Sequence, residues 1–130
     1  MKLALAQANK IIGNTGQNPA VGCVVVKNDT LISAGHTSLN GRPHAEINAI
    51  NNSKTNLTNS SLYVTLEPCS HYGKTPPCIK SIYKNKIKKV FFSVYDPDIR
   101  SYKKSTNFLK KKKIFVNRGL YSPAINFFYK

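Results

Sequence analysis

The sequence predicts an α/β protein in which helices cover a largely buried, mixed sheet. Short β-branched and aromatic runs alternate along the chain with segments in which apolar residues have helical spacing. Such alternation is typical of a sandwich of helices and sheet. The chain has 130 residues, 41% of them hydrophobic, which is enough for one domain with a core of its own. We therefore expect a single domain over residues 1–130.

The first half of the chain contains two predicted helices and one predicted hairpin. Residues 3–12 have the apolar spacing of a short helix that ends near Gly13. The continuous run Val21–Val26 predicts a strand buried on both faces, and residues 28–29 predict a turn into a partner strand over 31–35. A second helix is expected from His44, with that residue in its first turn.

The second half continues the alternation of strand and helix. Leu62–Leu66 predicts a strand whose carboxyl end leads into Glu67-Pro68-Cys69. A helix is expected from Pro76-Pro77 onward, followed by a strand over Lys89–Val94. Weaker patterns predict a helix over 105–109, a strand over 114–116 and a terminal helix over 123–129.

The formal net charge of +15 raises the question of a nucleic-acid partner. Arginine occurs only at positions 42, 100 and 118, so the positive charge is carried almost entirely by lysines. The densest lysine run, Lys110 to Lys113, is far in sequence from the cysteine-rich segment described below. We therefore favour a small anionic molecule over nucleic acid as the partner, since one or two cations would be enough to bind it.

The cysteines and the hydropathy pattern predict an intracellular setting. Three cysteines without a secretory leader argue for a metal site or reactive thiols rather than a disulfide framework. Cys23 lies inside an apolar run and is expected to pack as a small hydrophobe, which leaves Cys69 and Cys78 for chemistry. No apolar run has the ~20 residues of a membrane span. We expect a cytoplasmic protein with no membrane partner.

Two short segments contain the best candidates for a catalytic metal site. The first carries His44 and Glu46, and the second carries Cys69 and Cys78. One imidazole and two thiolates can fill three of the four tetrahedral positions that Zn²⁺ prefers. Glu46 follows His44 by two residues, as in the signature of zinc-dependent nucleobase deaminases, where the glutamate moves protons and is not a ligand. Eight residues separate the two cysteines, whereas the commoner deaminase pattern has two. Taken alone, the spacing leaves open whether Cys78 is a ligand or a core residue.

The segment Glu67–Cys78 resembles the signature of the riboflavin-pathway pyrimidine deaminases, in which a long insertion between the cysteines is normal. These enzymes form the deaminase half of the bifunctional diaminohydroxyphosphoribosylaminopyrimidine deaminase/reductase. The resemblance runs from about residue 3 to about residue 120. Further matching segments are Asn18–Cys23, Gly41–Glu46, Tyr63–Pro68 and Asp96-Pro97.

The resemblance implies a fold, a reaction and a set of contacts. The fold would be the cytidine-deaminase-like three-layer α/β/α sandwich with a central mixed sheet of about five strands. Zinc held by His44, Cys69 and Cys78 would activate water for the hydrolytic deamination of a ribosylamino-pyrimidinone 5′-phosphate, with Glu46 as the proton carrier. Four further residues would contact this substrate, namely Asn18, His71, Lys74 and Thr75.

Three questions stay open at this stage. A tRNA, polynucleotide or nucleoside deaminase, or a zinc-stabilised module that binds a nucleotide without catalysis, would share most of these residues. Asp98 stands where many relatives have asparagine, and a carboxylate there would repel an anionic substrate. The chain contains no reductase domain, so it is either a standalone deaminase, with a separate reductase as a potential partner, or part of a longer protein. Homo-oligomerisation is compatible with the resemblance.

Overall fold

The computed structural model describes residues 1–97, 100 and 102–129, and its strands form one five-stranded sheet. The sheet order is β2-β1-β3-β4-β5. β1 pairs antiparallel with β2 and β3, whereas β3, β4 and β5 run parallel. The predicted mixed sheet is confirmed. Its strands are β1 (Gly22–Lys27), β2 (Thr30–His36), β3 (Ser61–Leu66), β4 (Lys89–Val94) and β5 (Phe115–Arg118).

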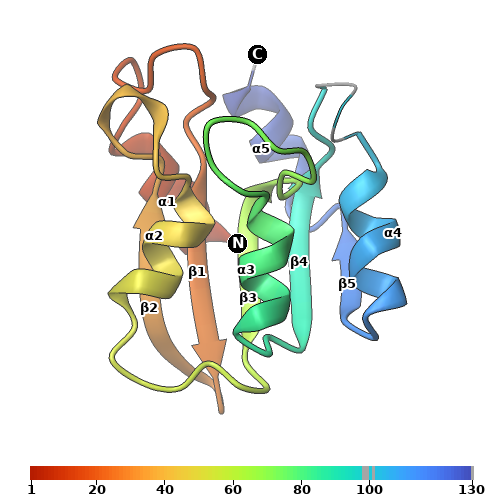
Figure 1. The fold of residues 1–130 in the computed structure, drawn as a ribbon. Helices are drawn as coiled ribbons and strands as arrows, with labels where there is room; N and C mark the ends of the chain where they lie inside the picture. The colour runs from red at the N-terminus through yellow and green to blue at the C-terminus, as the bar shows by residue number, and fades with distance from the viewer. Residues whose placement is uncertain (98–99, 101, 130) are drawn as a thin grey trace.

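Helices cover the sheet in two layers, which completes the α/β/α sandwich. In Figure 1, α2, α3 and α4 lie in front of the sheet and α1 and α5 lie behind it. A short 3₁₀ turn, η1 (Leu39–Gly41), precedes α2. The helices are α1 (Lys2–Asn9), α2 (Ala45–Asn52), α3 (Cys78–Lys84), α4 (Lys104–Lys111) and α5 (Ser122–Phe128).

The core lies mainly between the sheet and the layer formed by α2, α3 and α4. β1 is buried from Gly22 to Val25, as expected for a strand covered on both faces. Cys23 is fully buried among apolar side chains, which confirms its expected packing as a small hydrophobe. Leu62, Val64 and Phe92 fill the centre of the sheet, and Ile82 packs on them from α3.

The hairpin between β1 and β2 follows the turn predicted at residues 28–29. Asn28 and Asp29 both have positive φ values, 52° and 61°. This left-handed pair matches the right-handed twist of the two strands, and Asn and Asp tolerate it better than other residues that carry a Cβ. Lys27 therefore pairs with Thr30 directly across the turn.

Most element boundaries differ from the sequence expectations by one to three residues, and three of these differences have a physical reason. The first helix ends at Asn9 rather than residue 12, because the Lys10 and Ile11 N–H groups bond to carbonyls only three residues back and the chain then turns at Gly13, which has a positive φ. His44 caps α2 in an extended conformation and does not lie in its first turn. The helix expected over 105–109 is longer and spans α4, where positively charged side chains stabilise the carboxyl end.

The carboxyl ends of β3 and β4 and the amino ends of α2 and α3 meet at one edge of the sheet, the upper edge in Figure 1. In open α/β sheets, ligands bind beyond the carboxyl ends of the strands. The signature residues are therefore carried to the edge where a site is expected. Among the residues that the structure describes, no helix has the length and apolar character that a membrane crossing requires.

Candidate active site

His44 is positioned by the turn that opens α2. Its backbone is extended, with φ −70° and ψ 165°, and its carbonyl accepts the Asn48 N–H, which begins the helix. The Asn48 side chain donates to the carbonyl groups of His36 and Pro43 and so fixes the chain that enters the helix. The imidazole makes no capping bond and is free to face the neighbouring loop.

Cys69 and Cys78 come from the two ends of the loop between β3 and α3. Cys69 follows the last residue of β3 by three positions, and Cys78 is the first residue of α3. The Cys78 backbone N–H donates to the Cys69 sulfur at 3.1 Å, and the Ile79 N–H donates to the Cys69 carbonyl at 3.4 Å. The amino end of α3 therefore holds Cys69 in place and favours its thiolate form.

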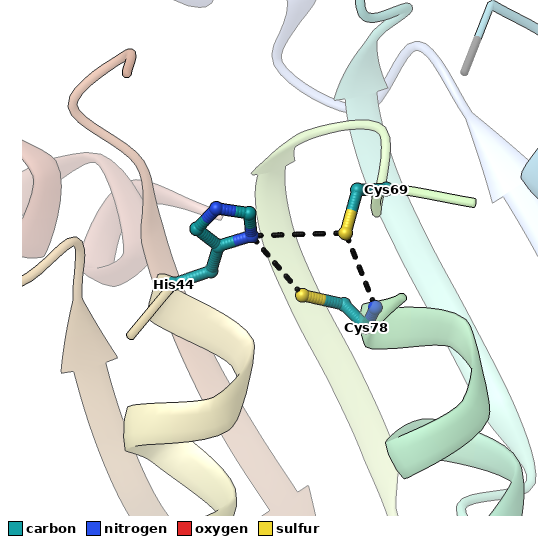
Figure 2. A group of neighbouring side chains, drawn as sticks. All are labelled: His44, Cys69 and Cys78. Atoms are coloured by element: carbon teal, nitrogen blue, oxygen red, sulfur yellow. Dashed lines mark hydrogen bonds between the residues drawn. The ribbon is translucent and has the colours of Figure 1, made fainter. Parts of the chain in front are cut away.

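The three side chains converge on one point, as Figure 2 shows. The Nδ1 atom of His44 lies 3.7 Å from the Cys69 sulfur and 3.4 Å from the Cys78 sulfur. All three ligand atoms lie within 4.8 Å of one another. Tetrahedral Zn²⁺ with ordinary Zn–N and Zn–S bonds would separate nitrogen from sulfur by about 3.6 Å. The donor set and its spacing fit zinc with one position left over for another ligand.

Proton sharing within this cluster supports the same conclusion. Hydrogen bonds from the Cys78 thiol, the His44 ring and the Cys78 backbone lower the pKa of Cys69 to about 4. The pKa of Cys78 is raised because its thiol donates to Cys69 and is buried. The hydrogen bond to Cys69 also raises the pKa of His44. One thiolate thus gathers three donors, and a divalent cation at the centre would stabilise both sulfurs as thiolates.

Glu46 lies in the first turn of α2, beside the cluster. Its side chain is only 4% exposed, yet it lines the same cleft as His44 and Cys69. Burial, and the negative charge of Cys69, raise the pKa of the Glu46 carboxyl to about 7, while His44 and hydrogen bonds from Cys78 and the Glu46 backbone oppose this shift. A buried carboxyl that faces a metal-ligand set and an open cleft is placed to move protons.

A cleft of about 770 Å³ opens in front of the cluster, within the size range of small-molecule sites. Asn18 and His71, two of the predicted substrate contacts, line it. The Asn18 side chain donates to the Gly41 carbonyl at 2.9 Å, which fixes its amide at the wall of the cleft. The remaining walls are formed by Gln17, Pro19, Val21, Thr37, Arg42, Leu66, Glu67, Gly73, Val94, Tyr95, Asp96, Pro97, Arg100, Asn126 and Tyr129.

Lys74 and Thr75 lie in the loop between the cysteines, but they are exposed and do not line the cleft. The Thr75 hydroxyl accepts a hydrogen bond from the Arg42 guanidinium at 3.0 Å. Substrate contacts for these two residues stay predictions. Asp98, expected to influence the same region, lies outside the described residues.

Two residues of the site were not assigned a role from the sequence. Glu67 is buried, and its carboxylate accepts the backbone N–H groups of Asp96 and Lys103 and the Ser105 hydroxyl. It therefore fastens the loop after β4 to the segment that carries Cys69. Its position directly before Pro68-Cys69 is the feature of the sequence that could have indicated a role in the site. Arg42 also lines the cleft, and its position two residues before His44 could have indicated this from the sequence.

A His/Cys/Cys cluster and an adjacent buried glutamate, at the carboxyl edge of a mixed sheet, define a zinc-dependent deaminase. The family model for the cytidine and deoxycytidylate deaminase zinc-binding region matches residues 1–94. This match covers both cysteines, His44 and Glu46. The zinc assignment therefore stands on the donor geometry and on the family match together.

More specific similarity is found among curated proteins and solved structures. A diaminohydroxyphosphoribosylamino-pyrimidine deaminase of Buchnera aphidicola (subspecies Schizaphis graminum) is 44% identical over 83% of this chain and 74% of its own length. The riboflavin biosynthesis protein RibD of Bacillus amyloliquefaciens is 44% identical over 92% of this chain and 32% of its own. The Thermotoga maritima deaminase/reductase crystal structure superposes with a TM-score of 0.91 at 38% identity, covering 96% of this chain and 36% of that one.

This chain belongs to the family of riboflavin-biosynthesis pyrimidine deaminases, within the zinc-binding cytidine and deoxycytidylate deaminases. It spans about a third of the length of the bifunctional relatives, in which a reductase is fused to the deaminase, and about three quarters of the Buchnera protein. The resemblance predicted from the sequence is confirmed.

Proposed function

We propose that this protein hydrolyses 2,5-diamino-6-(5-phosphoribosylamino)pyrimidin-4(3H)-one to 5-amino-6-(5-phosphoribosylamino)uracil and ammonia in riboflavin biosynthesis. The observation that carries the proposal is the convergence of His44, Cys69 and Cys78 beside Glu46 at a cleft. The similarity of the chain to named diaminohydroxyphosphoribosylamino-pyrimidine deaminases supports the choice of substrate.

The reaction adds water at the amine-bearing ring carbon, forms a C–O bond and breaks the C–N bond so that ammonia leaves. Bound zinc supplies Lewis-acid activation of a water at neutral pH. Glu46 would accept a proton from the attacking water and deliver protons to the ring nitrogen and the departing amine. Its burial excludes bulk water from these transfers, and its place in the first turn of α2 keeps it beside the ligands.

Substrate orientation is assigned to groups that line the cleft. Asn18 is held by its bond to Gly41, and His71 belongs to the loop between the cysteines, so the two residues line the cleft from different segments. We propose that they bind the pyrimidine and ribose parts of the substrate. The further contacts predicted for Lys74 and Thr75 would require the exposed loop to close over the bound molecule.

In the proposed pathway, the product of this deaminase is the substrate of a reductase. That reductase is fused in bifunctional relatives such as RibD, whereas the Buchnera relative matches this chain over most of its length. We propose that residues 1–130 act as one deaminase domain whose product passes to a reductase, either separate or attached. The cytoplasmic location and the homo-oligomer expected from the sequence stay predictions.

The direct test is ammonia release by the purified, zinc-loaded protein offered three compounds in parallel. These are the ribosylamino-pyrimidinone phosphate, cytidine and a tRNA anticodon stem-loop. Release from the first alone is the expected result. Release from the stem-loop would overturn the substrate assignment in favour of a polynucleotide deaminase, which the +15 charge would then explain. Silence on all three with zinc bound would favour a non-catalytic binding module.

A further inference from the structure

Arg42 lines the cleft but has no role in the zinc site described above. It is half-buried, lies two residues before His44, and lines the cleft. Its Nη1 atom donates to the Thr75 hydroxyl at 3.0 Å across the gap to the loop between the cysteines. A Cβ atom built on Gly73 would lie 3.2 Å from its Nη2 atom, so the guanidinium packs against that loop. The guanidinium therefore spans the two segments that carry His44 and Cys69.

Most of the donor capacity of Arg42 is left for a ligand. A guanidinium has five N–H donors, and the one hydrogen bond recorded for it in the described part of the chain uses a single nitrogen. No carboxylate is paired with it among those residues. Asp29 lies in the distant hairpin turn, and the Glu67 carboxylate already accepts three hydrogen bonds. An arginine of this kind favours the bidentate recognition of a phosphate.

The charges around the cleft are arranged so that an anion is favoured at Arg42 and disfavoured elsewhere. Glu46 and Glu67, which are 4% and 2% exposed, are among the residues that line the cleft. Asp96 lines the cleft as well. A phosphate would be repelled from these groups and attracted to the guanidinium beside Gly73 and Thr75. A molecule with a neutral ring and a phosphate is thereby oriented with its ring toward the zinc ligands.

The other cations of the region are less suitable. Lys74 is exposed and does not line the cleft, so its ammonium has no fixed place in the site. Arg100 lines the cleft but is also exposed. Arg42, unlike these two exposed residues, is half-buried, and its guanidinium donates a hydrogen bond to Thr75 in the loop that faces it.

We propose that Arg42 binds the substrate phosphate and sets the preference of this deaminase for a phosphorylated over an unphosphorylated pyrimidine. The proposal rests on the proposed function, because it assigns a part of the same substrate. It makes Lys74 a secondary contact. Arg42 is thus a specificity residue, whose contribution is lost when the phosphate is removed from the substrate.

The test compares kcat and KM for the ribosylamino-pyrimidinone with and without its 5′-phosphate, using zinc-loaded protein. The variants are Arg42→Ala, Arg42→Lys and Lys74→Ala, with Lys54→Ala as a matched loss of positive charge in the loop after α2. Arg42→Ala is expected to raise KM for the phosphorylated compound by roughly 10- to 100-fold. KM for the unphosphorylated compound should stay within about threefold of wild type, and Arg42→Lys should recover part of the loss because it keeps the charge.

Two kinetic results would overturn the proposal. Equal losses of Arg42→Ala on both compounds would mean that Arg42 only holds the loop, and a larger KM effect from Lys74→Ala would place the phosphate at Lys74. If the wild-type protein turned over neither compound, the proposed function itself would fail. Calorimetry with ribose 5-phosphate would then decide the site: binding lost in Arg42→Ala but kept in Lys54→Ala supports it, and equal binding by both variants overturns it.

Discussion

At the scale of single residues, the site depends on how one short helical turn places two side chains. His44 is the cap of α2 and Glu46 lies in the first turn of the helix, so both residues stand at the same helix end, and both line the cleft. The positive end of the helix favours negative charge at this point. The two-residue spacing therefore has a geometric reason: it separates the proposed metal ligand His44 from the proposed proton carrier Glu46 while keeping them adjacent.

Glu46→Gln tests this division of roles. The substitution keeps the size of the buried side chain but removes its capacity to carry protons. We expect kcat to fall by about 10²- to 10⁴-fold, the usual range for a lost general acid–base group. Zinc content, measured by elemental analysis, should match that of the wild type. A variant that lost its zinc would instead identify Glu46 as part of the ligand set.

Glu67→Gln tests the carboxylate that fastens the loop after β4. Its oxygens accept three hydrogen bonds in a buried position, so an amide nitrogen in place of one oxygen would face a donor. We expect the free energy of unfolding, measured by urea denaturation, to fall by about 1.5–3 kcal/mol. Asp29→Asn, in the exposed hairpin turn, is the matched control and should change stability little. Equal behaviour of the two variants would refute the role of Glu67.

At the scale of elements, α2 can pack closely against the sheet because Gly35 in β2 has no side chain. A Cβ atom there would lie 2.5 Å from the Ala49 nitrogen and 2.8 Å from the Ala45 carbonyl oxygen. Backbone atoms cannot yield as a flexible side chain can. The close approach of helix and strand therefore fixes the distance from the sheet to the residues at the start of α2.

Gly35→Ala should displace α2 and with it Glu46. We expect a stability loss of about 1–3 kcal/mol from overpacking, together with a reduced kcat, measured by thermal unfolding and ammonia release. Ser33→Ala is the matched control on the same strand. Its buried hydroxyl has no hydrogen-bond partner among the described residues, so its removal should not destabilise the fold. A Gly35→Ala protein as stable as the wild type would contradict this account of the packing.

The sequence predicted best those strands whose residue pattern is clear within a few consecutive positions. Val21–Val26 is a continuous run of apolar and small residues, Lys89–Val94 is rich in Val and Phe, and β4 has the predicted boundaries. The first helix was predicted too long because Ile11 and Ile12 continue the apolar spacing, while their backbone already turns back on α1. The cap position of His44 was missed because a cap and a first-turn residue look alike in sequence when the capping bond is absent.

At the scale of the whole molecule, the zinc ligands join two separate parts of the sandwich. His44 belongs to the start of α2, whereas Cys69 and Cys78 bracket the loop from β3 to α3. Ligands that are far apart in sequence restrict the unfolded chain and stabilise the folded one when the metal binds. We therefore expect zinc to stabilise the fold as well as to take part in the chemistry.

Zinc removal should lower the thermal stability reversibly. With free zinc at about a thousand times its dissociation constant, the stabilisation is about 4 kcal/mol, so chelation should lower Tm by roughly 10 °C or more. Thermal unfolding with and without chelator measures the effect, and added zinc should restore the original Tm. A His44→Ala variant is the control and should respond far less to chelator. Identical melting of the wild type in both conditions would contradict the ligand assignment.

The sequence predicted the ligand set and the fold more completely than the cleft. The ligands lie in two short motifs with a recognisable chemistry, so their convergence could be anticipated. The cleft draws its walls from six segments between Gln17 and Tyr129. Only the folded chain shows that Arg42 bonds to Thr75 while Lys74 does not line the cleft. Such relations depend on side-chain placement across distant segments, which local patterns do not encode.

The measurement that tests the central claim most directly is turnover of the phosphorylated pyrimidine in water enriched in oxygen-18. The account predicts that zinc-loaded protein releases one ammonia for each uracil product and that each product carries one oxygen from water. Zinc-loaded Glu46→Gln should form neither product at a comparable rate. Ammonia without labelled product, or unchanged turnover in the variant, would contradict a hydrolytic deamination carried by His44, Cys69, Cys78 and Glu46.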